Sequence, residues 1–486
     1  MPNGGACATE PAGTGPTALW GTAVCRLLDW RSCHVTVRDT MPAASAAPAD
    51  LPASDRWVIF PSGPLSGDVT IAGAKNAALK HLAAALLTPG ETVLERVPDI
   101  EDITAMRHLL ASVGVTTRRQ DDGMHVLVPE QIGWEPDPTI AGQLRASVLL
   151  AAPLLARTGQ VRLPYPGGCK LGETRAIDLH LAALRALGAQ VSTEPDAVVA
   201  HTRRLRGTTI DLPRPSVGAT EQAMLTAAAA AGRTVIHGAA KEPEIADLAG
   251  LLTHMGAPVD GAGTSTIHVT PRGTLRPVRW RTVADRIEAG TFAAAALVTG
   301  GRVFLDGIDL APMAGTVRLL RHMGAAILPY DGGVVVDGAA PLAGAVIPAT
   351  PYPGLPTDLQ PMMTAVALGA SGTSEIIDTV FPDRLGVAEQ LALAGAPIEL
   401  GFQRAWVHGP VETPPGRYRG ADLRAAAALA VAGLGSSGAV EIDGMRHAHR
   451  GYDNFAGRLA ALGAQIATDP ERELLWATDI APAAEI

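Results

Sequence analysis

A short motif recurs six times along the chain at nearly constant spacing. In each copy a leucine is followed, a few residues later, by Gly-Ala or Gly-Val and then by an extended apolar segment. Glycine often supplies the left-handed residue at a helix C-terminus, so each copy predicts a helix, a glycine and a strand in that order. The successive copies are 74, 68, 68, 71 and 68 residues apart, and their glycines are Gly114, Gly188, Gly256, Gly324, Gly395 and Gly463.

A second landmark recurs with a similar period. A polar residue precedes an Ala-rich segment near Lys75, Arg145, Ser216, Arg286, Asp358 and Arg424. The Ala-rich segments carry almost no charge, which predicts helices that are buried on all sides, with a second, amphipathic helix in each unit lying outside. A period near 70 residues exceeds the 20 to 50 residues of solenoid repeats. The sequence therefore predicts six compact α/β units, each with its own small sheet.

Composition excludes several classes of protein. The chain has 486 residues, of which 47% are apolar and 18% charged, and its formal charge is −9, so it is neither disordered nor suited to binding nucleic acid. It contains no uncharged apolar run of about 20 residues, and Arg26 and Asp29 interrupt the apolar stretch near its start, so we expect neither a membrane span nor a secretory signal. We expect a cytoplasmic protein with a poorly ordered extension over residues 1–55.

The cysteines give no sign of a disulfide framework or a metal site. Three of the four lie in the first 40 residues, which leaves Cys169 alone in the body of the chain. Cys169 stands in a glycine-rich loop beside Lys170 and Arg175. An unpaired cysteine is most often a small buried hydrophobic residue. Neighbouring cations and glycines favour a reactive thiol instead, and the local context leaves both interpretations open.

The charges at the predicted helix starts have an unexpected sign. Helix N-termini attract anions, so Lys75, Arg145, Arg286 and Arg424 do not serve helix stability. A single cation of this kind is usually a solvated surface charge, but four at equivalent positions are harder to explain in that way. If the helix starts share one cleft, it would bind a small polyanion such as a phosphorylated carboxylate or a nucleotide. Asp358, the exception, would then be a candidate base.

Several motifs follow one another along the chain: LSGDVTIAGAKNAAL (65–79), LRAS (144–147), PGGC with DLH downstream (166–169 and 178–180), SVGAT (216–220), EPEI (242–245), DRIEAGTF (285–292), PTDLQ (356–360), DLRA (422–425) and HRGY (449–452). In this order across residues 58–480 they closely resemble the motifs of UDP-N-acetylglucosamine 1-carboxyvinyltransferases. The resemblance implies the enolpyruvyl transferase fold, an inside-out α/β barrel of two domains and six repeated units. Residues 56–74 and 286–480 would form one domain, and residues 75–285 the other, which carries the Cys169 loop.

The resemblance also implies a reaction and roles for particular residues. Phosphoenolpyruvate would donate its enolpyruvyl group to a hydroxyl of a uridine nucleotide, without a cofactor or a metal. Cys169 resembles the loop cysteine that acts as acid or adduct-forming thiol, Asp358 the base, and Lys75 a catalytic cation. Substrate-binding roles fall to Asn76, Arg145, Arg175, Asp178, His180, Ser216, Val217, Gly218, Arg384 and Arg424. We expect a monomer or a weak oligomer.

The chain departs from the family pattern in places that bear on the acceptor. Arg175 lies six residues after Cys169 and precedes Ala176, where the family has a spacing of five and a proline. Asp383 and His449 also replace residues that are usual in the family, Asn and Asp respectively. UDP-N-acetylglucosamine is the default acceptor, and the 3′-hydroxyl of UMP, as in nucleoside-antibiotic biosynthesis, is the alternative. A 5-enolpyruvylshikimate-3-phosphate synthase or a non-catalytic regulator fits less well, the latter because Cys169 and Asp358 are both retained.

Overall fold

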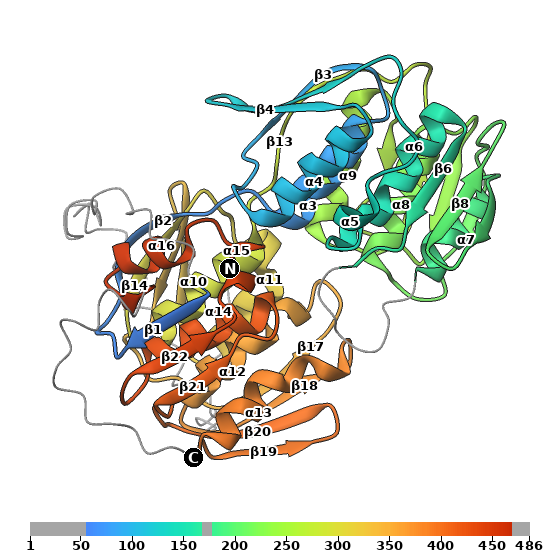
Figure 1. Ribbon diagram of the computed structural model, residues 1–486. Coiled ribbons are helices and arrows are strands. Elements are labelled where there is room, and N and C mark those ends of the chain that lie inside the picture. The colour runs from blue at the N-terminus through green and yellow to red at the C-terminus, as the bar shows by residue number, and fades with distance from the viewer. Residues whose placement is uncertain (1–54, 168–176, 469–486) are drawn as a thin grey trace, which may run out of the picture. The chain divides into compact units, whose positions relative to one another are not determined.

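The computed structural model describes residues 55–167 and 177–468, apart from the side chains of Pro382 and Asp383. The described residues form a mixed α/β structure whose strands are arranged in six small sheets (Figure 1). Each four-stranded sheet combines one parallel pair with two antiparallel pairs, and the three-stranded sheet is wholly antiparallel. The four-stranded sheets therefore share one pattern of strand pairing.

Three sheets are built from β1 and β2 at the start of the described chain together with strands between residues 302 and 467. They have the orders β21 (Gly416–Arg419), β22 (Val440–Asp443), β1 (Arg56–Phe60) and β23 (Gln465–Ala467); β15 (Ala326–Tyr330), β16 (Gly333–Asp337), β14 (Arg302–Asp306) and β2 (Ser66–Thr70); and β17 (Val346–Ala349), β18 (Gly372–Asp378), β20 (Arg404–Gly409) and β19 (Ile398–Gly401).

The other three sheets come from the middle of the chain. They have the orders β13 (Arg279–Arg281), β3 (Gly90–Glu95), β5 (Gly123–Val128) and β4 (Thr116–Gln120); β11 (Val259–Asp260), β12 (Thr266–Val269), β10 (Thr234–His237) and β9 (Thr209–Asp211); and β6 (Gln160–Pro164), β8 (Ala197–His201) and β7 (Gln190–Thr193).

The Ala-rich segments form the inner helices, as predicted. Nearly every residue of these helices is buried, because alanine lets helices pack closely on all sides. In one hydrophobic core α10, α12 and α14 pack against one another (Figure 1). The inner helices are α3 (Lys75–Ala85), η3 (Arg145–Leu150) continued by α6 (Ala151–Thr158), α8 (Val217–Ala228), α10 (Arg286–Val298), η5 (Thr357–Leu359) continued by α12 (Gln360–Leu368), and α14 (Leu423–Leu434).

The second helix of each unit ends at the recurring glycine. These glycines have φ angles between +91° and +115°, a region that favours glycine because it has no Cβ. The prediction of a helix, a glycine and a strand is thus confirmed at all six positions. The helices concerned are α4 (Glu101–Ser112), α7 (Asp178–Ala186), α9 (Pro243–Met255), α11 (Ala314–His322), α13 (Gly386–Leu393) and α16 (Phe455–Ala461); the short helices are α5 (Pro138–Ala141), η4 (Ala311–Met313), η6 (Pro382–Leu385) and α15 (Arg446–His449).

The buried apolar residues form two separate cores. One gathers residues 57–71 with residues 284–464, and the other gathers residues 78–269. Two connecting segments run side by side between the cores, since the N–H of Ala74 donates to the carbonyl of Val283 (2.7 Å) and the N–H of Asp285 to that of Ala72 (2.9 Å). They lead directly into α3 and α10. The starts of these two helices therefore lie close together.

Charged groups inside α3 and α8 depart from the expected uniform apolar character. Lys80 is buried in α3 with its Nζ 3.6 Å from Oε1 of Glu221, which is buried in α8. Burial raises the pKa of Glu221 to about 7, and Lys80 partly opposes that change. An alanine-rich pattern does not reveal such a pair, because its partners come from two helices distant in sequence.

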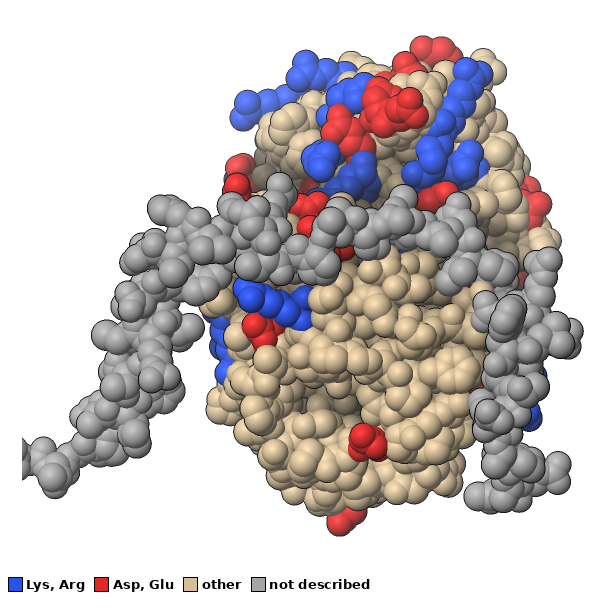
Figure 2. Space-filling model, turned by 90° about the vertical axis from the view of Figure 1, so that its left-hand side faces the viewer, with Lys and Arg blue, Asp and Glu red and all other residues tan. Residues whose placement is uncertain are grey.

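The surface and the helix lengths give two further facts. In the face drawn in Figure 2, Lys and Arg side chains lie among Asp and Glu side chains over part of the surface, and the remainder carries few charges. Within residues 55–167 and 177–468, every helix is too short or too polar to cross a bilayer.

Candidate active site

A carboxylate held between two buried arginines forms the centre of the candidate site. Asp358 lies in η5, at the start of the inner helix that α12 continues. Its Oδ1 accepts a hydrogen bond from Nη2 of Arg384 (2.8 Å), and its Oδ2 accepts one from Nη2 of Arg424 (3.0 Å). Both arginines are at most 5% exposed, whereas the Asp358 side chain is 27% exposed, so these charge-assisted bonds join two buried guanidinium groups to a partly accessible carboxylate. The predicted residues Asp358, Arg384 and Arg424 thus lie together.

Several neighbouring groups fix the position of Arg424. Its Nη1 donates to the hydroxyl of Tyr452 (3.1 Å), which also bonds to Thr291 (2.9 Å) on α10. Burial, the largest single influence, lowers the pKa of Arg424, but the Asp358 carboxylate together with Tyr452 and Asp285 outweighs burial, and the pKa is raised. Asp422 caps α14 by accepting from the Arg424 N–H (2.7 Å) and also lies 3.7 Å from Arg384. The helix start and the two guanidinium groups are therefore held by one set of contacts.

Lys75 lies at the first position of α3, as predicted, and is also buried. Its Nζ is 2.6 Å from Oδ2 of Asp102, whose Oδ1 accepts from Nε of Arg450 (2.9 Å). Burial lowers the pKa of Lys75, and the charges of Arg424 and Arg450 lower it further, whereas Asp102 raises it. Because the charge of Arg424 acts on Lys75, the Lys75 pair and the Asp358 cluster belong to one electrostatic site.

A shared N-terminal cap connects the Lys75 backbone to α10, which belongs to the other hydrophobic core. Asp285 accepts through Oδ2 from the Lys75 N–H (3.1 Å), and its Oδ1 accepts from the N–H groups of Ile287 (2.8 Å) and Glu288 (3.1 Å). A single carboxylate therefore satisfies backbone donors at the starts of both α3 and α10. This fixes the origin of the Lys75 side chain relative to α10.

A second group of predicted residues surrounds His180. Its Nε2 packs so closely on Gly218 that a Cβ at that position would lie 2.5 Å from it. Burial, and then the positive charge of Arg145 at the start of η3, lower the pKa of His180 to about 4. Ser216 caps α8 by accepting from the Ala219 N–H (3.4 Å), and Val217 is the first residue of that helix. His180, Arg145 and residues 216–218 are thus brought together.

The remaining predictions have mixed outcomes. Asn76, the second residue of α3, is partly buried, and Asp178 is exposed at the start of α7. Cys169 and Arg175 lie outside the described residues. Arg286 was expected to add positive charge to a cleft, but its guanidinium is buried against Glu244 with contacts of 2.9 and 3.3 Å. Arg286 is thus part of a neutralised pair, and the expectation for it is wrong.

Asp102, Arg450 and Tyr452 were not predicted from the sequence as site residues. Arg450 and Tyr452 stand in the HRGY motif, so their presence in a motif was a usable signal. Asp102 gave no comparable signal, because an acidic residue in the first turn of a helix is common. Its importance depends on two cations that are far from it in sequence.

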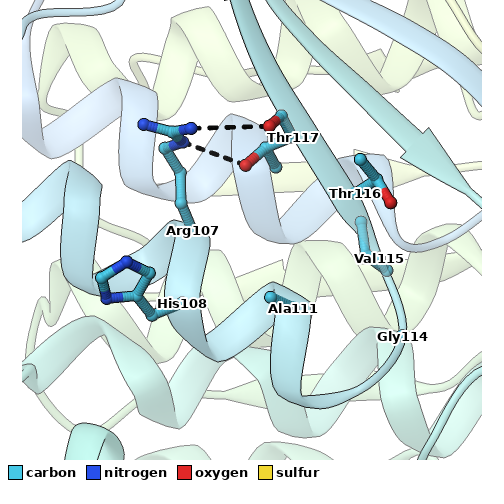
Figure 3. A pocket seen from close by; sticks show the side chains of 7 residues that line it. All are labelled: Arg107, His108, Ala111, Gly114, Val115, Thr116 and Thr117. Atoms are coloured by element: carbon cyan, nitrogen blue, oxygen red, sulfur yellow. Dashed lines mark hydrogen bonds between the residues drawn. The ribbon is translucent and has the colours of Figure 1, made fainter.

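Two further features are a pocket and the arrangement of the possible metal ligands. A pocket of about 390 Å³ lies where α4 ends and β4 begins, and Arg107 in its wall bonds to Thr117 at 3.0 and 3.5 Å (Figure 3). It contains none of the site residues described above. In the part of the chain that the structure describes, no group of three His, Cys, Asp or Glu side chains could hold a metal ion.

Comparison with known proteins assigns this fold and site to a family. The model of the EPSP synthase (3-phosphoshikimate 1-carboxyvinyltransferase) family matches residues 59–459. The chain belongs to this family of enolpyruvyl (1-carboxyvinyl) transferases.

Two groups of relatives are informative. A UDP-N-acetylglucosamine 1-carboxyvinyltransferase 1 of Symbiobacterium thermophilum is 41% identical over 419 residues, which cover 85% of this chain and 95% of that one. A UDP-N-acetylglucosamine 1-carboxyvinyltransferase from Anaeromyxobacter sp. (strain Fw109-5) is 40% identical over 417 residues, which cover 85% of this chain and 99% of that one. Among solved structures, the enolpyruvyl transferase NikO from Streptomyces tendae has a TM-score of 0.77 at 26% identity, with 85% and 98% coverage. EPSP synthase from Acinetobacter baumannii (TM-score 0.66, 20% identity, 85% and 99% coverage) shares the fold.

Proposed function

We propose that this enolpyruvyl transferase moves the enolpyruvyl group of phosphoenolpyruvate to a hydroxyl of UDP-N-acetylglucosamine and releases inorganic phosphate, a step in the synthesis of peptidoglycan precursors. The acceptor is the one in the names of relatives about 40% identical to this chain. The observation that carries the proposal is the Asp358 carboxylate between two buried arginines, within electrostatic reach of Lys75. This cluster combines a base with cations for a multiply charged donor.

The cations would bind the donor. Arg384 and Arg424 present planar guanidinium groups that suit a carboxylate, and Lys75 suits a phosphate oxygen as a compact point charge. Arg145 would add a further positive charge. Because Lys75, Arg384 and Arg424 are buried, their attraction for an anion is stronger than at the surface.

The reaction requires two opposed proton transfers. As the acceptor oxygen bonds to the central carbon of phosphoenolpyruvate, Asp358 would take the hydroxyl proton while an acid protonates the terminal carbon. The addition product then loses a proton from that same carbon, the C–O bond to phosphate breaks, and the enol ether and inorganic phosphate result. Asp358 has acceptor oxygens for the first transfer, and cations on either side would stabilise charge that develops on the donor.

Cys169 supplies the acid or the adduct-forming thiol in this proposal, on the strength of the family resemblance. The epoxide fosfomycin should therefore alkylate Cys169, because a thiol flanked by cations has more thiolate character. Intact-mass analysis should find one adduct on the wild-type chain and none on Cys169→Ser. Cys25→Ser is the control and should still be alkylated; a wild-type chain that stays unmodified would argue against a reactive thiol at Cys169.

The acceptor would lie against the group around His180. The start of α8, at residues 216–218, presents backbone N–H groups of the kind that bind phosphate oxygens. His180, whose pKa of about 4 keeps it neutral at physiological pH, could hydrogen-bond a uridine nucleotide without adding charge. Asn76, Arg175 and Asp178 complete the proposed acceptor contacts.

At the level of the whole fold, we propose the inside-out barrel of six units, divided into residues 56–74 with 286–480 and residues 75–285, and the two separate cores support this division. Cytoplasmic localisation and a monomeric or weakly oligomeric state stay predictions.

The test is phosphate release from phosphoenolpyruvate with one acceptor at a time. We expect release with UDP-N-acetylglucosamine and a product that is heavier than the acceptor by the enolpyruvyl group. The departures at Asp383 and His449 make UMP the second acceptor to assay. Release with UMP alone would reassign the acceptor, and no release with either nucleotide or with shikimate 3-phosphate would refute the proposed activity.

The low pKa of His180 predicts a loss of stability in acid. In the unfolded chain this histidine gains its proton near pH 6.5, but in the folded chain only near pH 4, so between these values the unfolded state binds more protons. The free energy of unfolding should fall as the pH drops from 6.5 to 4, by up to about 3 kcal/mol at about 1.4 kcal/mol per pH unit. Urea unfolding at several pH values should show a weaker dependence in His180→Asn. His201→Asn, at an exposed position, is the control and should unfold with the pH dependence of wild type. The same pH dependence of the unfolding free energy in His180→Asn as in wild type would contradict the prediction.

A further inference from the structure

Asp102 is a buried carboxylate whose role the proposed reaction leaves open. It is 5% exposed and lies in the first turn of α4, a helix that has no side-chain cap. One oxygen is 2.6 Å from Nζ of Lys75, and the other accepts from Nε of Arg450 at 2.9 Å. Each oxygen thus engages a different cation. Lys75 opens the inner helix of one core, whereas Arg450 follows α15 and donates through Nη2 to the carbonyl of Gln143 (3.3 Å).

This arrangement is the one expected of a bound anion. A phosphate offers the same kind of acceptor oxygens to a lysine and an arginine. Asp102 therefore occupies one donor of each cation and the space between them. A phosphate cannot take these same two donors while Asp102 holds them, because the Asp102 oxygens already lie at contact distance.

The buried cations need an anion beside them for electrostatic reasons. Lys75 is buried, and two positive charges, those of Arg424 and Arg450, act on it. Without a carboxylate the buried ammonium would face repulsion and desolvation together, both of which favour loss of its proton. Asp102 keeps the lysine charged and in place before the donor arrives.

We propose that Asp102 is a resident substitute for phosphate: it holds Lys75 and Arg450 together while no phosphate is bound, and it is displaced from them when a phosphate group binds. The inference rests on the proposed function to the extent that the donor carries a phosphate. Competition from Asp102 weakens phosphate binding, because Lys75 and Arg450 are released from Asp102 in only a small fraction of the molecules. It also favours departure of the phosphate product, since the carboxylate can return to the cations.

The first test compares the affinity of Asp102→Asn and of wild type for inorganic phosphate by isothermal titration calorimetry. If the competing carboxylate occupies the cations in about nine molecules of ten, its removal should tighten phosphate binding about tenfold. Glu101→Gln is the matched control: it removes the same charge from the same helical turn at an exposed position and should stay within about twofold of wild type. Unchanged or weaker phosphate binding in Asp102→Asn would overturn the inference, because a carboxylate that merely positions Lys75 would help phosphate to bind.

A second measurement uses the wild-type chain and does not depend on the folding of the variant. In a crystal structure with inorganic phosphate, we expect phosphate on Lys75 and Arg450, with Asp102 more than 4 Å from at least one of them. Retention of both Asp102 contacts in a phosphate-bound site would refute displacement. Failure of this inference and failure of the proposed function can be distinguished. If the wild-type enzyme turns over phosphoenolpyruvate but Asp102→Asn does not bind phosphate more tightly, only the role of Asp102 is refuted. If the wild-type enzyme shows no turnover, the proposed reaction is refuted, and the phosphate affinities of the two chains still decide the role of Asp102.

Discussion

Replacing Asp358 with Asn should lower kcat for phosphate release by about 10²- to 10⁴-fold, the usual contribution of a positioned general base. The amide has nearly the same shape but cannot take the acceptor proton. The KM for phosphoenolpyruvate should rise little or even fall, because Arg384 and Arg424 would lose a competing carboxylate. A large decrease in kcat without a matching increase in KM is therefore the expected signature.

Stability must be measured with the same variant, since the structure gives Asp358 a second role. Its two charge-assisted hydrogen bonds join buried guanidinium groups, so their weakening should cost about 1–3 kcal/mol of unfolding free energy. Asp309→Asn, at an exposed position in the same half of the chain, controls for the loss of one negative charge. A kcat within tenfold of wild type in a folded Asp358→Asn variant would exclude Asp358 as the base.

The sequence predicted the parts of the fold that local rules determine. A left-handed glycine after a helix is a local requirement, and all six recurring glycines adopt it. The inner helices were predictable because a run of alanines without charge is stable mainly when it is buried. Asp285 illustrates the limit: its position before α10 suggests a cap, but its bond to the Lys75 N–H spans 210 residues.

The charges of the site could be predicted individually but not as pairs. The cations at the helix starts suggested an excess of positive charge, whereas the structure places carboxylates against three of them. Lys75 is paired with Asp102, Arg286 with Glu244, and Arg424 with Asp358. Only the last carboxylate was recognised from its motif as part of the site. The others depend on contacts between helices that neither periodicity nor spacing encodes.

The second large effect concerns stability and comes from the Arg286–Glu244 pair. Glu244 lies on α9 and Arg286 at the start of α10, and their side chains are 5% and 9% exposed. Burial lowers the pKa of Arg286, but Glu244 together with Glu242 and Asp285 outweighs burial, so the pKa of the guanidinium is raised. Glu244→Gln would leave a buried cation without its carboxylate, which should cost about 3–5 kcal/mol of unfolding free energy.

Urea unfolding followed by circular dichroism provides the measurement, and the chain offers a matched surface pair as control. Glu375 and Arg404 lie 2.7 Å apart but are 24% and 44% exposed, so Glu375→Gln should cost at most about 1 kcal/mol. The double variant Glu244→Gln/Arg286→Met should recover much of the lost stability, because a buried ion pair can often be replaced by uncharged side chains at little cost. If Glu244→Gln destabilised the protein no more than Glu375→Gln does, the guanidinium would have to find another anion, and Arg286 would again be a candidate for the positive charge of the active site.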